Sequence, residues 1–107
     1  MPTTEEKIQQ QIDENPVIIY MKGTPKFPQC GFSGHAVKFL SETGIDYAYV
    51  NVLESPSIYE RLPAFSQFPT FPQVFIGGEL VGGSDIVEEL AANGELVPMM
   101  QAAISAS

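Results

Sequence analysis

Four short runs of apolar and β-branched residues predict the strands of this chain. Val17–Met21 is apolar at every position, which is typical of a strand buried on both faces. Residues 47–52 form a second run. Gln73–Ile76 and residues 79–81 flank Gly77-Gly78, and two adjacent glycines supply the positive φ angles of a tight hairpin turn. We therefore expect four strands, the last two joined as a hairpin.

Apolar residues with three- and four-residue spacing predict helices between and around these strands. Ile8 and Ile12 share one face of a first helix, which starts at a capping-box pair, Thr3 and Glu6, and ends before Pro16. Further helices are expected at residues 31–43, ended by Gly44, at residues 55–64, at residues 84–94, capped by Ser84, and from residue 95 into an Ala/Ser tail that frays.

The order of these elements predicts the fold class. Strand, helix and strand within residues 17–52 form a βαβ unit, whose two strands are parallel and whose crossover is right-handed. The hairpin adds two strands, which gives a four-stranded mixed α/β sheet flanked by helices on both faces. Residues 1–107 are expected to form one domain, because 44% apolar residues suffice for one buried core.

Charge and composition exclude several functions. Thirteen acidic against five basic residues give a formal charge of -8, which argues against binding the phosphate backbone of nucleic acid. No apolar stretch reaches the length of a membrane span, and residues 1–7 do not resemble a signal peptide. The single cysteine suits a reducing compartment. We therefore expect a cytoplasmic protein without a nucleic acid or membrane partner.

That cysteine, Cys30, is the main candidate for chemistry. It lies at the start of the helix predicted over residues 31–43, and Lys22, Lys26 and Lys38 are within eight positions of it. Free N–H groups at a helix start and nearby ammonium groups both favour a thiolate. Such a sulfur can attack a disulfide or bind a metal.

Two other segments are expected to meet Cys30 at the carboxyl edge of the parallel strands, where ligands bind in such sheets. Residues 68–72 (Phe-Pro-Thr-Phe-Pro) directly precede a strand, and a cis proline there would expose the preceding backbone to an extended peptide-like ligand; an ordinary rigid turn is the alternative. The two glycines of residues 82–85 leave the N–H groups of a helix start open to a carboxylate.

Four motifs in this order, Lys22-Gly-Thr, Cys30-Gly-Phe-Ser, Pro69-Thr-Phe-Pro and Gly82-Gly-Ser-Asp, make the chain resemble the monothiol glutaredoxins of the Cys-Gly-Phe-Ser class. The resemblance covers nearly the whole chain. It implies a thioredoxin fold, a bound glutathione and a [2Fe-2S] cluster held between two subunits.

Residue roles follow from the same resemblance. It makes Cys30 the catalytic thiol and the metal ligand, and it pairs Lys22 with the glycyl carboxylate of glutathione. It further implies that Phe71 pairs with the glutathione backbone and that Asp85 meets its γ-glutamyl end. The complete set of implied glutathione contacts is Lys22, Cys30, Phe32, Thr70, Phe71, Pro72 (as a cis proline), Gly83, Ser84 and Asp85.

The cysteine count favours a shared cluster. A [2Fe-2S] centre usually takes four thiolates, and this chain supplies one. Two chains and two glutathione thiols complete the set, which predicts a homodimer bridged by the cluster and two glutathiones. A cluster held in this way suits transfer to apo iron-sulfur proteins or the sensing of iron. The resemblance also suggests a BolA-like protein as partner.

The chain departs from the family pattern at two positions. Tyr59 stands where many relatives carry an arginine for the glutathione carboxylate, and Arg61, two residues on, is expected to face elsewhere. Tyr59 is thus a candidate glutathione contact, and glutathione affinity depends on what it does. Phe68 replaces a tryptophan, which keeps an aromatic ring without the indole N–H.

Two other functions are compatible with the same residues. The first is a glutathione-dependent thiol-disulfide oxidoreductase that removes glutathione from proteins through Cys30 alone, since Ser33 stands where a resolving cysteine would be. The second is an inert thioredoxin-like interaction module with an incidental cysteine. An inert thiol would react with iodoacetamide at the rate of an unperturbed cysteine.

The remaining histidine and aromatic residues are interpreted as structural. His35 diverges from Cys30 by roughly 140° around a helix, so a cysteine-histidine dyad is not expected and His35 is assigned to solvent. Phe39, Tyr47, Tyr49 and Phe75 are assigned to the core.

Overall fold

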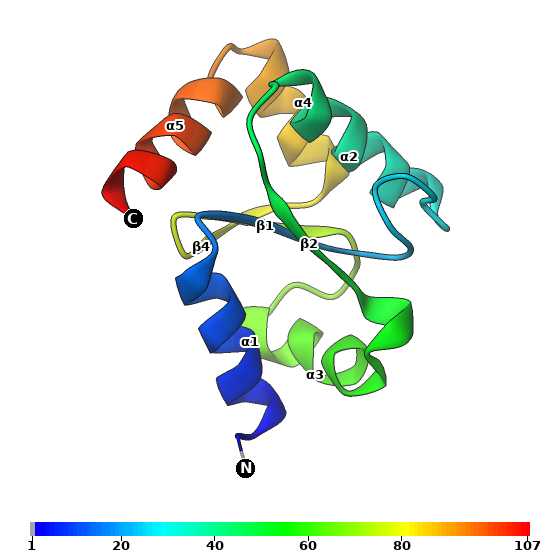
Figure 1. Ribbon diagram of the computed structural model, residues 1–107. Helices are drawn as coiled ribbons and strands as arrows, with labels where there is room; N and C mark the ends of the chain where they lie inside the picture. Colours follow the sequence, from blue (N-terminus) through cyan, green and yellow to red (C-terminus); the bar gives the residue numbers. More distant parts are fainter. Residues whose placement is uncertain (1) are drawn as a thin grey trace.

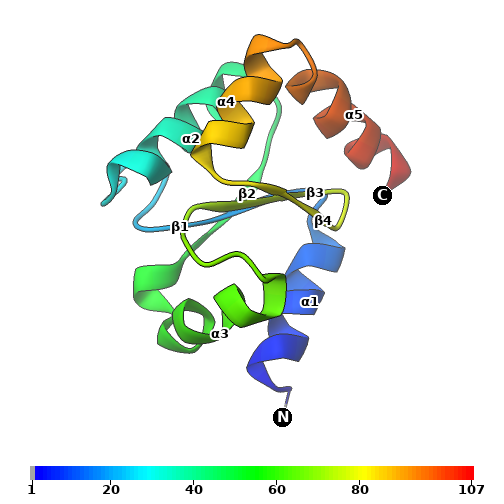
Figure 2. The same ribbon diagram turned by 180° about the vertical axis from the view of Figure 1, so that it is seen from behind.

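A mixed sheet of four strands lies between two layers of helices (Figures 1 and 2). The computed structural model describes residues 2–107. Among these residues no helix is both long and apolar enough to cross a bilayer. The elements are α1 (Thr4–Glu14), β1 (Val17–Met21), α2 (Gly31–Glu42), β2 (Ala48–Asn51), the 3₁₀ helix η1 (Val52–Glu54), α3 (Pro56–Ser66), β3 (Gln73–Ile76), β4 (Glu79–Gly82), α4 (Ser84–Ala92) and α5 (Leu96–Ala106).

The strand order is β2-β1-β3-β4, which places β1 inside the sheet. Ile18 of β1 aligns with Ala48 in the parallel strand β2 and with Phe75 in the antiparallel strand β3. β3 pairs antiparallel with β4. The predicted mixed sheet with a βαβ unit and a terminal hairpin is therefore confirmed.

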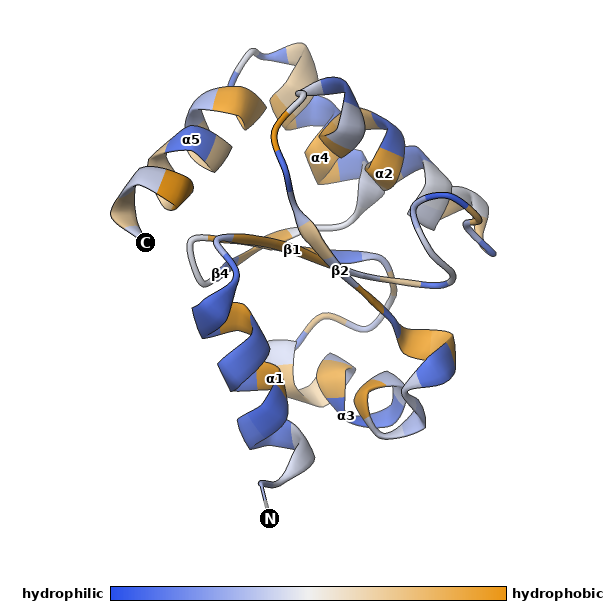
Figure 3. Ribbon diagram, in the orientation of Figure 1, coloured by the Kyte–Doolittle hydropathy of each residue, from blue (hydrophilic) through white to orange (hydrophobic). Residues whose placement is uncertain are grey.

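The side chains of β1 alternate between two separate cores. Val17, Ile19 and Met21 pack under α2, α4 and α5 on one face, whereas Ile18 and Tyr20 pack against α1 and α3 on the other. Figure 3 shows β1 as hydrophobic along its length, while α1 is mostly hydrophilic with a few hydrophobic positions. Because both faces of the sheet are covered, a strand without polar positions is stable here.

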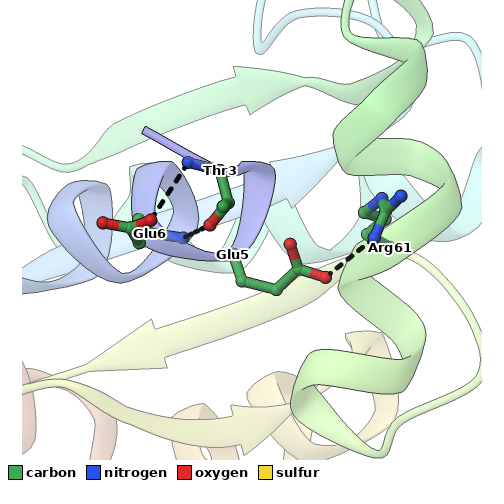
Figure 4. Close-up of polar contacts among 4 residues, drawn as sticks. All are labelled: Thr3, Glu5, Glu6 and Arg61. Carbon is green, nitrogen blue, oxygen red and sulfur yellow. Dashed lines mark hydrogen bonds and ion pairs between the residues drawn. The ribbon is translucent and has the colours of Figure 1, made fainter. Parts of the chain in front are cut away.

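Helix α1 begins with the predicted capping box. The Glu6 N–H donates to Thr3 Oγ1 at 3.1 Å, and the Thr3 N–H donates to Glu6 Oε1 at 3.2 Å (Figure 4). Next to it, Arg61 Nη1 of α3 donates to Glu5 Oε2 at 3.1 Å. Arg61 is thus turned toward α1, which agrees with the expectation that it faces elsewhere than Tyr59.

Several element boundaries differ from the sequence predictions. The second strand ends at Asn51 and not at residue 52, because the Asn51 side chain accepts the Leu53 N–H at 3.0 Å and starts η1. Helix α3 continues past residue 64 to Ser66, and Gln67 then takes a left-handed conformation (φ 57°). Helix α5 continues to Ala106, so the predicted fraying of the tail is not observed.

Two further sequence predictions are wrong in detail. Ser84 does not cap α4; it is the first residue of that helix, and Gly83 occupies the capping position without a side-chain hydrogen bond. Tyr49 is not a core residue, since 47% of it is exposed. It lies on β2, an edge strand, where the neighbouring helices do not reach its side chain. Phe75 is buried as predicted.

The loop between β1 and α2 carries the cysteine and is held by its own backbone. The Gln29 N–H donates to the Lys22 carbonyl at 2.9 Å, and Gly23 forms a bridge with Pro28. Gly23 has φ +94°, and a Cβ there would lie 2.5 Å from the Phe27 carbonyl oxygen. The loop therefore requires glycine both for its backbone angle and for space.

We predict that Gly23→Ala destabilises the protein more than Gly44→Ala. Both glycines have positive φ, but a Cβ at Gly44 meets no atom within 4 Å. Urea unfolding should show a loss of about 1 kcal/mol for Gly44→Ala and about 3 kcal/mol or more for Gly23→Ala. Equal losses in the two variants would contradict the steric argument.

Candidate functional site

A cleft of about 790 Å³ opens at the carboxyl end of β1. Four parts of the chain form it: the loop and helix start around Cys30, helix α3, the segment before β3, and the start of α4. All residues assigned to glutathione from the sequence line this one cleft, and so does Tyr59. The complete lining is Lys22, Cys30, Phe32, Tyr59, Pro63, Phe68, Pro69, Thr70, Phe71, Pro72, Gly83, Ser84, Asp85 and Ile86.

Cys30 occupies the N-cap position of α2, with extended backbone angles and a half-buried side chain. The Ser33 N–H, assisted by the Phe32 N–H and the Lys22 ammonium, holds the pKa of the Cys30 thiol below its usual value, although partial burial opposes this. At the start of α2, the Cys30 side chain accepts no capping hydrogen bond. The N–H groups therefore act mainly as dipoles that favour the thiolate.

Ser33 connects helix α2, which begins after Cys30, to the backbone of Lys22. Its side chain is fully buried, and its Oγ accepts the Lys22 N–H at 3.1 Å. This contact joins the first turn of α2 to the residue after β1, so the fold sets the position of the Lys22 backbone relative to the helix start. The sequence identified Ser33 only as the position of an absent second cysteine.

Asn51 supports the same loop from the neighbouring strand. Its Oδ1 accepts the Gly23 N–H at 2.9 Å, and its Nδ2 donates to Glu54 Oε1 at 2.9 Å. The sequence interpretation did not identify this residue. An asparagine at the end of a predicted strand was the available signal, because asparagine side chains commonly cap turns there.

Residues 68–72 form the wall opposite Cys30. The Phe71-Pro72 peptide bond is cis, as the sequence suggested. Among residues 2–107, the Phe71 N–H and carbonyl have no hydrogen-bond partner. An unpaired backbone next to a cleft can accept an extended peptide as a short additional strand.

The start of α4 closes the other end of the cleft. The first backbone bond of this helix runs from the Val87 N–H to the Gly83 carbonyl at 3.1 Å, so the N–H groups of residues 84–86 are free of helical bonds. Gly83 lets this turn approach the wall, since a Cβ there would lie 3.2 Å from the Pro72 carbonyl oxygen. Asp85 is exposed beside these groups.

The remaining corner of the cleft holds a lysine against two aromatic rings. The Lys22 ammonium lies 5.6 Å from the centroid of the Tyr59 ring, and the Tyr59 and Phe71 rings are 5.3 Å apart. Arg61 is engaged by Glu5 on the far side of α3. Lys22 is therefore the only lysine or arginine lining the cleft in the described chain.

His35 is less exposed than the sequence suggested. Its Nε2 lies 3.4 Å from Glu88 Oε2 of α4, and its ring packs edge-on against Phe39 at 5.0 Å. It lines a separate shallow hollow of about 420 Å³ that also reaches Cys30. No hydrogen bond joins His35 to Cys30 within the described residues, consistent with the absence of a cysteine-histidine dyad.

The described chain offers Cys30 as a single thiol ligand and no metal site of its own. Among residues 2–107, no group of three or more histidine, cysteine or carboxylate side chains is close enough to hold a metal ion. Any metal centre at this cleft would thus need ligands from outside the chain.

Comparisons with known proteins identify the family of the chain. Residues 17–81 match the Glutaredoxin family model. The chain is similar to glutaredoxin 4 of Escherichia coli K12, at 52% identity over 94% of this chain and 88% of that protein. It is also similar to a probable monothiol glutaredoxin of Legionella pneumophila, at 54% identity over 83% of this chain and all of that protein.

Structural comparison leads to the same family. The crystal structure of a buckwheat glutaredoxin-glutathione complex superposes with a TM-score of 0.81 at 29% identity, over 95% of this chain and 96% of that one. The thioredoxin fold expected from the sequence is confirmed. With one cysteine, at the helix start that lines the cleft, the chain belongs to the glutaredoxin family and to its monothiol class.

Proposed function

We propose that this monothiol glutaredoxin binds glutathione in the cleft and carries a [2Fe-2S] cluster between two subunits for delivery to apo iron-sulfur proteins. The proposal rests on one observation. Cys30, whose thiolate is favoured, shares a single cleft with one lysine, the unpaired backbone of Phe71 and the start of α4. The buckwheat relative of the same fold forms a glutathione complex.

The chemistry of the cleft matches glutathione group by group. The tripeptide carries two carboxylates, one ammonium and two peptide bonds. Lys22 complements the glycyl carboxylate, and the unpaired backbone of Phe71 complements the cysteinyl peptide groups. The free N–H groups at the start of α4 suit the γ-glutamyl carboxylate, and Asp85 suits its ammonium. Thr70, Phe32 and cis Pro72 provide the adjoining surface.

The ligand count supports a shared cluster as cargo. Each chain supplies the Cys30 thiolate, and a bound glutathione places a second thiol beside it. Two such subunits provide the four thiolates that a [2Fe-2S] centre usually takes. Cys30 is suited to this role because its sulfur is half-exposed at the mouth of the cleft and its thiolate is favoured. A BolA-like protein as an alternative second subunit belongs to the same proposal.

A second candidate function uses the same thiol as a nucleophile. The Cys30 thiolate would attack the glutathione sulfur of a glutathionylated protein, form a mixed disulfide and release the protein thiolate. A second glutathione thiolate would then attack that disulfide, release oxidised glutathione and restore the Cys30 thiolate. Ser33, which is buried and bonded to Lys22, cannot resolve the disulfide, so the chain depends on glutathione for turnover.

The carrier function predicts a glutathione-dependent cluster dimer. Anaerobic reconstitution with iron, sulfide and glutathione should give visible charge-transfer bands on a dimer, measured by absorption and size exclusion. Cys30→Ser, or omission of glutathione, should abolish both the bands and the dimer. A colourless monomer from the unmodified chain would contradict the carrier function and favour the oxidoreductase.

The electrostatics of α2 predict a reactive thiol. Since the pKa of Cys30 is lowered, its thiolate persists as pH falls below the range where a free cysteine, with a pKa of about 8.5, becomes protonated. Iodoacetamide labelling at pH 7 should be several-fold faster than for a cysteine in the unfolded chain. Lys22→Gln should slow it only slightly, because the Ser33 N–H is the larger cause. A rate equal to that of the unfolded chain would support the inert-module alternative.

The single lysine in the cleft predicts that a second cation strengthens binding. Tyr59→Arg should tighten glutathione binding about three- to tenfold in calorimetry, since an added charge-assisted contact at a partly exposed site contributes about 0.6–1.4 kcal/mol. Tyr49→Arg adds the same charge at an exposed tyrosine that does not line the cleft. Unchanged affinity of Tyr59→Arg, or an equal gain in Tyr49→Arg, would rule out a carboxylate contact at this position.

A further inference from the structure

Gln73 is a fully buried polar residue directly behind the cleft wall. It is the first residue of β3 and follows cis Pro72, and none of its surface is exposed. Its Nε2 donates two hydrogen bonds, to the Phe68 carbonyl at 2.9 Å and to the Thr70 carbonyl at 3.2 Å. One amide group thus holds two points of the segment that faces Cys30.

The other half of the same amide is unsatisfied. Within the described chain, Gln73 Oε1 is buried and accepts no hydrogen bond. Burying such an acceptor is unfavourable, and an apolar side chain of similar size avoids that loss. The unsatisfied acceptor thus offsets stability that the two donated bonds contribute. What the amide adds without offset is a fixed position for the two carbonyls.

Those bonds are the main hydrogen-bond restraint on the cleft wall. Apart from them, the segment from Phe68 to Phe71 is tied by one bond, from the Phe68 N–H to the Pro63 carbonyl at 3.2 Å, in the described residues. Thr70 is exposed, so its carbonyl can bind water when the amide is absent. Loss of the Gln73 amide would leave the wall folded but less well positioned.

We propose that Gln73 is a positioning residue for the tripeptide ligand. Its amide fixes the Phe68 and Thr70 carbonyls and thereby sets the place and orientation of the Phe71 backbone. The Phe71 N–H and carbonyl, which have no partner in the described chain, are left available to the ligand. The inference rests on glutathione binding in this cleft. It assigns part of the affinity to a residue that does not line the cleft.

The test compares binding, stability and thiol reactivity in Gln73→Met. S-methylglutathione is the probe, because it keeps the charges and peptide groups of glutathione but has no free thiol. Calorimetry should show a five- to tenfold weaker binding to Gln73→Met. Urea unfolding should change little, since the variant removes both two hydrogen bonds and one unsatisfied acceptor. The iodoacetamide rate at Cys30 should also be unchanged, because α2 sets it.

Tyr20→Phe is the matched control. Tyr20 is equally buried, pairs with Gln73 in the sheet register, and donates from its hydroxyl to Gln11 Oε1 at 2.8 Å, away from the cleft. Deleting that hydroxyl should lower the urea midpoint but leave the affinity for S-methylglutathione as in the unmodified chain. A loss of affinity in both variants would show that binding follows stability in general, and would overturn the positioning role.

Gln73→Glu gives a signature that packing alone cannot produce. A carboxylate accepts hydrogen bonds but donates none, so it cannot hold the two carbonyls; a protonated carboxyl can donate to one of them. Burial beside carbonyl oxygens favours the protonated form. The affinity of this variant should therefore rise several-fold as the pH falls from 8 to 5.5, relative to the unmodified chain over the same range.

The outcomes separate this inference from the proposed function. If the unmodified chain does not bind S-methylglutathione, glutathione recognition itself is wrong. If it binds and Gln73→Met binds equally well, only the positioning role is overturned. A loss of affinity in Gln73→Met that is accompanied by an equal change in thiol reactivity or a large loss of stability would also overturn it, because the effect would then be a general distortion.

Discussion

The structure depends on the burial of β1 on both faces. Its five residues divide between two cores, one under α2, α4 and α5 and the other over α1 and α3. Each fully buried aliphatic side chain in such a strand contributes about 1.5–3 kcal/mol. The end of β1 is consequently anchored from both faces of the sheet. Lys22 directly follows the last residue of this strand, so the backbone of the cleft lysine is attached to the core.

Polar contacts also connect the helix that carries Cys30 to the end of β1. Ser33 connects the first turn of α2 to the Lys22 N–H, and Asn51 connects the end of β2 to the Gly23 N–H. These contacts are partly buried, and a hydrogen bond lost on one side leaves its partner poorly satisfied there. Three elements that meet at one edge of the sheet thus hold the helix start at Cys30 and the backbone of Lys22 in place. The pKa of Cys30 is lowered mainly by the Ser33 N–H in the first turn of α2, with a smaller effect of the Lys22 ammonium, so the favoured thiolate needs no second cysteine.

The sequence predicted the fold well because its strongest signals are local and redundant. The apolar run of β1, the glycine pair of the hairpin and the capping box at Thr3 and Glu6 each have a short-range physical cause, and each was found where expected. The exposure of Tyr49 was not predictable in this way. Whether a strand residue is covered depends on its place in the sheet and on the reach of distant helices.

The residues that line the cleft were predictable from the sequence, but the residues whose hydrogen bonds hold its walls were not. Residue chemistry alone indicated the thiol, the lysine, the proline-rich segment and the helix start, and the resemblance to a known family supplied the individual residues, which line the cleft. Asn51 bonds to the backbone of Gly23, which is 28 positions away in the sequence, so no local pattern indicates that partner. Gln73 bonds to carbonyls only three and five positions before it, but its side chain reaches them because the intervening segment turns back at cis Pro72. A polar residue at the start of an otherwise apolar strand was the one visible signal for Gln73.

Part of the proposed recognition surface is backbone, so it does not depend on the side chain that position 59 carries. The Phe71 N–H and carbonyl and the N–H groups that begin α4 are present whatever side chains those positions carry. Backbone groups are placed only by the elements that hold them, so buried polar residues behind the wall control the geometry of the site. Changes on the surface of the cleft then adjust affinity through charge, while changes behind it alter the positions of the binding groups themselves.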